Sequence, residues 1–174
     1  MDNVVEVNNY PLKEIMEMSK DTSRRIGLGV MGWADLLFAM DIPYNSNEAR
    51  ELAFNFQDFI TMHAERFSEG LAHEKGTFGA WKTSTFGKAK RLMRNAFHTT
   101  VAPTGTISII ANCSGGIETL YALSFKREVM PDDSGNFVLM EEHNPYWKEA
   151  ISKAKLDKGT KEALLEHAIE YGNI

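Results

Sequence analysis

The sequence predicts an α/β fold in which strands and helices alternate along one domain. Its 174 residues are 43% hydrophobic and include ten Phe and three Trp, which is enough apolar volume for a core. Apolar residues recur at steps of three and four between residues 45 and 76, as on the buried face of a long helix. Residues 98–102 are rich in β-branched side chains and indicate a strand. This alternation favours parallel strands joined by helices.

Shorter elements complete the prediction. Asn45 and Glu48 are spaced as a capping box at the start of the long helix. The other expected strands are residues 4–7, 25–30 and 120–127, of which 25–30 also fits helical spacing. The other expected helices are residues 11–20, 33–40, 145–155 and 160–171, the last two following a turn at 131–136. Residues 131–174 are acidic and are typical of a solvated, helical edge.

Composition argues against several classes of function. With 19 basic and 24 acidic residues, the chain has a formal net charge of −5, unlike a globally basic nucleic-acid-binding protein. No segment approaches the run of about 20 apolar residues that a membrane-spanning helix needs. The single cysteine, Cys113, cannot form an internal disulfide, which fits a reducing, cytoplasmic compartment. We therefore expect neither a nucleic-acid partner nor a membrane partner.

The charges are unevenly distributed along the chain. Between residues 75 and 117 there are six basic side chains and no acidic one, namely Lys75, Lys82, Lys88, Lys90, Arg91 and Arg94. A solvated surface loop would explain such a run. A site for an anion would explain it equally well, because a positive field raises the local concentration of a phosphate ligand.

The strongest candidate site is the turn that follows the predicted strand at 98–102. Thr104, Thr106 and Ser108 place hydroxyl groups at alternate positions, while Gly105 allows close approach to the backbone. If a helix begins near Ile107, its free N–H groups and positive dipole end face the turn, as in phosphate sites at helix N-termini. The same residues could instead form a helix cap that binds no ligand.

Other motifs carry less information. Gly27, Gly29 and Gly32 match G-x-G-x-x-G, but they lie inside an apolar element and not in a turn after a strand, so close backbone packing explains them better than dinucleotide binding. Cys113 could be a nucleophile with His98 as its base, although a small cysteine beside glycines is more often a packing residue. The histidine spacing predicts no metal site. We expect no catalytic and no metal-ligating residue in this chain.

Three segments resemble the catalytic subunit of ribonucleotide reductase. They are residues 24–37, residues 95–108, which close on Ala102, Pro103 and Thr104, and residues 112–118. The residues of these segments are most similar to those of the adenosylcobalamin-dependent class II enzymes. The resemblance extends over residues 1–174 as a single partial domain, and it is strongest over residues 24–127.

The resemblance implies a fold, a reaction and a site. The fold is part of a ten-stranded α/β barrel, and the reaction is the reduction of ribonucleotides to deoxyribonucleotides by a cysteine thiyl radical. Carried onto this sequence, the family's phosphate-binding turn comprises Thr104, Gly105, Thr106, Ile107 and Ser108. The implied cofactor is adenosylcobalamin, in the complete enzyme and not on motifs of this chain. The implied enzyme class is ribonucleoside-diphosphate reductase.

The departures from the family are equally informative. The radical cysteine, the pair of reducing cysteines and the C-terminal tail cysteines have no counterpart in a chain with one cysteine. The chain therefore resembles a central to C-terminal piece of the barrel and is expected to be inactive alone. The remaining segments of the subunit are its expected partners, and the exposed apolar faces of a partial barrel also predict self-association.

Two other functions fit the same residues. The chain could be a nucleotide-binding or assembly module, in which the turn holds a nucleotide for regulation. It could also be a structural remnant in which the turn only caps a helix. Nucleotide binding without any reductase partner favours the first alternative, and a turn with no ligand effect to remove favours the second.

Overall fold

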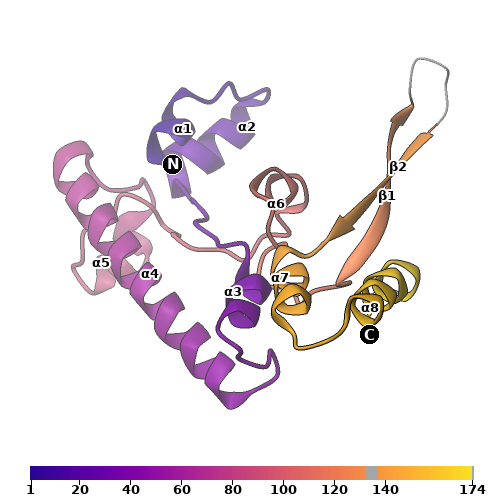
Figure 1. Ribbon diagram of the computed structural model, residues 1–174. Coiled ribbons are helices and arrows are strands. Elements are labelled where there is room, and N and C mark those ends of the chain that lie inside the picture. Colours follow the sequence, from indigo (N-terminus) through magenta and orange to yellow (C-terminus); the bar gives the residue numbers. More distant parts are fainter. Residues whose placement is uncertain (132–136, 174) are drawn as a thin grey trace.

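The computed structural model describes residues 1–131 and 137–173, with side chains described outside residues 127–138. In chain order its elements are α1 (Asp2–Val7), α2 (Lys13–Met16), η1 (Glu17–Ser23), α3 (Trp33–Ala39), α4 (Asn47–Lys75), η2 (Trp81–Thr83), α5 (Thr85–Lys88), α6 (Gly105–Ala111), β1 (Ser124–Pro131), β2 (Phe137–His143), α7 (Pro145–Lys153) and α8 (Lys158–Tyr171). Figure 1 shows α1, α2 and α5 around one end of the molecule, and the β1–β2 hairpin with α7 and α8 at the other.

The predicted helices are mostly confirmed. The helix expected at 45–76 is α4, and those expected at 33–40, 145–155 and 160–171 are α3, α7 and α8. The helix expected at 11–20 is divided into α2 and the π-helical turn η1. The predicted cap of α4 was wrong by one residue, because Ser46 and not Asn45 accepts the N–H of Ala49, at 3.0 Å.

The predicted strands need more correction. Residues 4–7 lie in helix α1, so the strand expected there was wrong. The strand expected at 120–127 begins only at Ser124, and it pairs antiparallel with β2, a strand that the sequence did not predict. Of the turn expected at 131–136, residues 132–136 lie outside the described residues.

The two segments predicted as parallel strands do lie side by side. Ile26 N–H donates to the carbonyl of Phe97 at 3.1 Å, and Leu28 N–H donates to that of His98 at 2.8 Å. Thr100 N–H donates back to the carbonyl of Leu28 at 3.0 Å, which completes a single parallel bridge between Leu28 and Thr99. The pairing is therefore parallel, as expected, although it is too short to count as a sheet.

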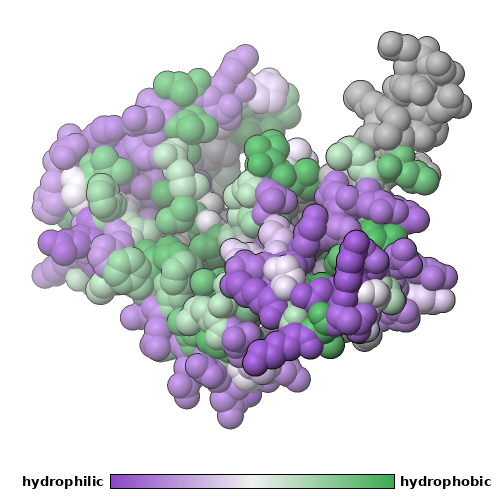
Figure 2. All heavy atoms as spheres, in the orientation of Figure 1, coloured by the Kyte–Doolittle hydropathy of each residue, from purple (hydrophilic) through white to green (hydrophobic). Residues whose placement is uncertain are grey.

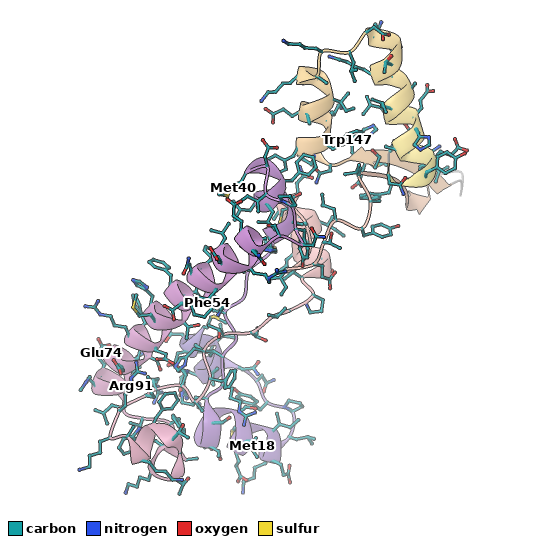
Figure 3. The ribbon with its side chains drawn as sticks, turned by 90° about the horizontal axis from the view of Figure 1, so that it is seen from below. Met18, Met40, Phe54, Glu74, Arg91 and Trp147 are labelled. Carbon is teal, nitrogen blue, oxygen red and sulfur yellow. The ribbon has the colours of Figure 1, made fainter. Side chains whose placement is uncertain are left out.

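Two apolar clusters meet at α3. Trp33 and Leu37 pack with Ile42 and with Ala49 at the start of α4. On the other side, Phe38 packs against the second cluster, which is formed by Trp147, Ile151 and Ala168 together with Leu123, Leu164 and Leu165. Figure 3 shows Trp147 where α7 approaches α8. Helix α3 is therefore the junction between the two ends of the molecule.

The chain leaves much of its surface uncovered. Its accessible area is 12239 Å², whereas a folded monomer of 19.6 kDa is expected to expose about 8,600 Å². Phe54 and Phe67 of α4 are 73% and 76% exposed, and Figure 2 shows hydrophobic residues gathered over the region that α4 occupies in Figure 1. An area this large is typical of part of a domain.

A buried polar cluster fixes the amino-terminal helix to the paired segments. The Asp2 carboxylate accepts hydrogen bonds from Arg24, at 2.8 Å and 3.0 Å, and from the amide of Asn95, at 3.0 Å. Asn95 is fully buried and also donates to the carbonyl of Arg24 at 2.9 Å. Burial alone would raise the pKa of Asp2, but the hydrogen bonds from Arg24 and Asn95 and the charges of Arg24 and Arg94 outweigh it and lower that pKa.

Replacement of Asp2 by Asn is expected to lower the free energy of unfolding by about 3 kcal/mol at pH 7, because it leaves the buried Arg24 guanidinium without its main partner. Since the folded-state pKa of Asp2 is depressed, this stabilisation is present above the ordinary pKa and is lost as the carboxylate becomes protonated. The difference between wild type and Asp2→Asn in urea denaturation should therefore shrink as the pH falls below about 4.

Glu6→Gln is the matched control. Glu6 also pairs with Arg24, at 3.0 Å, but its side chain is 49% exposed, so its removal should cost under about 1 kcal/mol. Equal losses for the two variants, or a loss for Asp2→Asn that does not change with pH, would contradict the assigned role of the buried pair.

Candidate functional site

The glycines of residues 27–32 serve close packing. A Cβ atom on Gly27 would lie 2.6 Å from Cγ2 of Thr100, and one on Gly29 would lie 2.7 Å from the Thr100 carbonyl oxygen. Gly32 precedes α3 with a φ of +80°, a conformation that residues with side chains rarely adopt. The interpretation of this motif as a packing device is confirmed, since two of its glycines allow the parallel segments to approach.

The predicted turn leads directly into α6, and the first N–H groups of this helix form no hydrogen bond with the described residues. Thr104 precedes the helix with a φ of +55°, and its side chain makes no capping hydrogen bond. Ser108 N–H, bonded to the carbonyl of Thr104 at 2.9 Å, is the first to pair within the helix. Within the described part of the chain, the N–H groups of Gly105, Thr106 and Ile107 have no hydrogen-bond partner, and all three residues are exposed.

The hydroxyl groups of the turn are not equivalent. The Thr104 hydroxyl oxygen accepts the N–H of Gly116 at 2.6 Å, which leaves its own proton free to donate. Ser108 is buried, and its hydroxyl donates to the carbonyl of Gly105 at 3.2 Å. A Cβ atom added to Gly105 would meet nothing within 4 Å. Thr104, Gly105, Thr106 and Ile107 therefore form the open part of the turn, and Ser108 supports it from inside.

The two arginines of the basic segment do not lie at this turn. Arg91 pairs with Glu65 and Glu69 of α4, and Figure 3 shows it beside Glu74 at the end of α4 remote from α7 and α8. Arg94 donates to the carbonyls of Lys75 and Gly76, at 3.0 Å and 3.2 Å. These two arginines therefore do not lie at the turn, because carboxylates and helix-end carbonyls bind them elsewhere.

The loop of residues 112–116 is part of the site that the sequence did not predict. Its Gly116 N–H orients Thr104, and a Cβ atom on Gly116 would lie 2.7 Å from the carbonyl oxygen of Ala102. Cys113 in this loop packs against Gly32, and burial together with the nearby charge of Asp35 raises the pKa of its thiol. A protonated, packed thiol agrees with the interpretation of Cys113 as a packing residue. The adjacent glycines 115 and 116 were the available signal for close packing against the turn.

The described residues contain no group of three or more His, Cys, Asp or Glu side chains placed to hold a metal ion. None of their helices combines the length and the hydropathy required to cross a bilayer.

The chain is similar to known proteins over nearly its whole length. Residues 1–172 match the family described as "Ribonucleotide reductase, barrel domain". The chain is 41% identical over 174 residues to a vitamin B12-dependent ribonucleoside-diphosphate reductase of Thermoplasma acidophilum, covering all of this chain and 22% of that protein. It is 45% identical over 130 residues to the enzyme of that name from Mycobacterium tuberculosis, covering 75% of this chain and 18% of the relative.

The fold agrees as well. The solved alpha subunit of the class Id ribonucleotide reductase of Actinobacillus ureae superposes with a TM-score of 0.64 at 21% identity, over 96% of this chain and 29% of that one. The predicted class, part of an α/β barrel, is thereby confirmed. The chain spans about a fifth of the length of the curated relatives named above. With a barrel-domain match over nearly every residue and relatives more than 40% identical, the chain belongs to the ribonucleotide reductase family.

Proposed function

We propose that this chain supplies the substrate-phosphate site of a ribonucleotide reductase catalytic subunit. The observation that carries the proposal is the group of three exposed, unbonded N–H donors at Gly105, Thr106 and Ile107. In the longer protein the reaction is the reduction of ribonucleoside diphosphates by a thiyl radical, in the service of deoxyribonucleotide synthesis and DNA replication. Residues 1–174 act there as a single partial barrel domain.

The turn has the chemistry that a phosphate group requires. Backbone N–H groups at the start of a helix carry partial positive charge and point toward an anion. The free proton of the Thr104 hydroxyl and the exposed Thr106 hydroxyl add two further donors. The open space at Gly105 lets a phosphate oxygen approach the backbone. Recognition relies on main-chain dipoles and hydroxyl groups, since no lysine or arginine belongs to the turn.

The radical chemistry belongs to other parts of the longer protein. Formation of a disulfide during nucleotide reduction consumes two thiols, and this chain has one cysteine, whose thiol is held protonated. The purified chain alone should therefore yield no deoxyribonucleotide. A single cysteine also suits a reducing cytoplasm, and the acidic net charge of −5 supports a function without a nucleic-acid partner.

Adenosylcobalamin is proposed as the radical generator of the longer protein, following the vitamin B12-dependent relatives. The residues of this chain do not fit that cofactor. Two pockets among the described residues measure about 510 Å³, beside Trp33 and Phe56, and about 530 Å³, beside His143 and Leu165. Each is sized for a small ligand and is too small for a corrinoid with its nucleotide tail. We assign no residue of this chain to the cofactor.

The uncovered apolar surface supports two kinds of partner, the remaining segments of the catalytic subunit and a second copy of this chain. Phe54 and Phe67 are 13 residues apart on α4, which places them about 140° apart around the helix. A helix with exposed aromatic residues on more than one side is buried when its protein is complete. Either partner would cover the apolar faces of α4 that this chain leaves exposed.

Gly105→Val is expected to weaken the binding of a ribonucleoside diphosphate at least tenfold, because the β-branched side chain occupies the space that the phosphate needs. Isothermal titration calorimetry of the purified chain with ADP measures the effect, and the wild type should bind with a sub-millimolar dissociation constant. Gly70→Val is the matched control, since Gly70 is also exposed and a Cβ atom there also meets nothing within 4 Å. Binding that survives Gly105→Val unchanged would show that the turn does not hold the phosphate.

The wild-type chain is expected to self-associate at micromolar concentration when no other reductase segment is present. Phe54→Glu and Phe67→Glu should shift it toward the 19.6 kDa monomer in sedimentation velocity, because each places a charge on an exposed apolar face. Gln57→Glu, at an exposed polar position on the same helix, adds the same charge and should leave the distribution unchanged. A wild type that stays monomeric at every concentration would argue against the self-association.

A further inference from the structure

A buried carboxylate lies behind the phosphate turn without a cationic partner. Asp35 is only 4% exposed. No Lys, Arg or His among the described residues forms an ion pair with its carboxylate. Its two oxygens are instead satisfied by neutral donors. Oδ2 accepts the N–H of Ser114 at 2.6 Å, and Oδ1 accepts the amide of Asn144 at 2.7 Å.

The position of Asp35 in α3 explains why the charge can be buried. It lies in the first turn of that helix, where the positive end of the helix dipole favours a negative side chain. Charge-assisted hydrogen bonds of this length are stronger than neutral ones, and removal of the acceptor leaves both donors buried without a partner. Asp35 therefore fixes two segments that are 79 and 109 residues away in sequence.

The first of these segments holds the phosphate turn. Ser114 is fixed on two sides, because its carbonyl also accepts the N–H of Gly32 at 2.8 Å. Two residues later, Gly116 N–H donates to the Thr104 hydroxyl oxygen at 2.6 Å. Gly116 also packs so closely on the carbonyl of Ala102 that a Cβ atom would not fit. A shift of this loop must therefore move Thr104 and the first turn of α6.

The second segment connects the same carboxylate to α7. Asn144 caps this helix, since its Oδ1 accepts the N–H groups of Tyr146 and Trp147 at 3.0 Å and 3.1 Å. Its amide nitrogen is then directed to Asp35. Trp147 in turn anchors the apolar cluster between α7 and α8. The carboxyl-terminal helices are thus linked to the turn through one hydrogen-bonded pair.

We propose that Asp35 is a positioning residue for substrate binding. It holds the loop of residues 114–116 in the arrangement that presents the turn to a ribonucleoside diphosphate. Asn144 couples α7 and α8 to the same loop. This inference rests on the proposed phosphate site. Asp35 does not touch the ligand, and it acts through Ser114, Gly116 and Thr104.

The test uses Asp35→Asn and a variant that restores the pairing. In Asp35→Asn, an NH₂ group must face either the N–H of Ser114 or the amide of Asn144, so one hydrogen bond becomes a clash of donors. In the double variant Asp35→Asn, Asn144→Asp, the two side chains exchange roles. The amide nitrogen at position 35 donates to the carboxylate at position 144, and the amide oxygen at position 35 still accepts the N–H of Ser114. An Asp at position 144 remains a good cap for α7. Asp58→Asn, at an exposed position of α4, is the control for loss of one carboxylate.

Two quantities are measured on all four proteins, the hydrogen-exchange rate of the Gly116 amide by NMR and the dissociation constant for ADP. Asp35→Asn should raise the exchange rate at least tenfold and weaken ADP binding at least fivefold. The double variant should return both to within about twofold of wild type, a rescue that a general loss of stability would not produce. Asp58→Asn should change neither quantity.

The outcomes separate this inference from the proposed function. A wild type that does not bind ADP overturns both. Binding that is lost in Gly105→Val but unchanged in Asp35→Asn overturns only the positioning role. If Asp35→Asn does not fold, the double variant decides: folding together with wild-type affinity supports the proposal, and folding with weakened affinity overturns it.

Discussion

Three main-chain hydrogen bonds between residues 26–28 and 97–100 bring together the segments on which the candidate site depends. The two segments can approach this closely only where the backbone carries no side chain. Gly27 and Gly29 meet this requirement, and both lie directly against Thr100. Asn95 closes the same junction, since it is fully buried and binds both Asp2 and the carbonyl of Arg24. From there the chain runs without another helix into the turn at Thr104. The N–H donors of the candidate turn therefore depend on this short parallel contact for their position.

The same contact shows why the chain is incomplete as a folding unit. Parallel strands are normally covered on both faces, whereas Leu28 in this isolated bridge is 44% exposed and the neighbouring Phe97 and Val101 are more exposed still. The accessible area of 12239 Å² and the exposed aromatic residues of α4 agree with a barrel of which the chain holds only a part. Membership of the reductase family agrees with this surface, since the Thermoplasma relative is about four and a half times as long as this chain. The hydrogen-bond donors of the turn and the loop behind it nevertheless all come from residues 102–116 of this chain.

The sequence predicted what local pattern determines and missed what tertiary contacts determine. Periodicity located α3, α4, α7 and α8, and hydroxyl spacing located the turn. The strand expected at 4–7 was wrong because these residues belong to helix α1, which the buried pair of Asp2 and Arg24 fixes through a partner distant in sequence. The basic run was open to two interpretations, a solvated surface and an anion site, because the partners of its arginines, Glu65, Glu69 and Asp2, are distant in sequence. Asp35 gave no signal at all, since one acidic residue in an apolar helix has a visible role only when Ser114 and Asn144 are in place.

The most direct measurement is the response of individual amides to inorganic pyrophosphate. In a titration followed by ¹H–¹⁵N NMR, the account predicts saturable downfield shifts at Gly105, Thr106 and Ile107, because these N–H groups are free and would become donors to phosphate oxygens. Amides within the long helix α4 should not move. Shifts confined to the basic segment at residues 82–94, or no saturable shift at the three free amides, would contradict the central claim that this turn is the phosphate site.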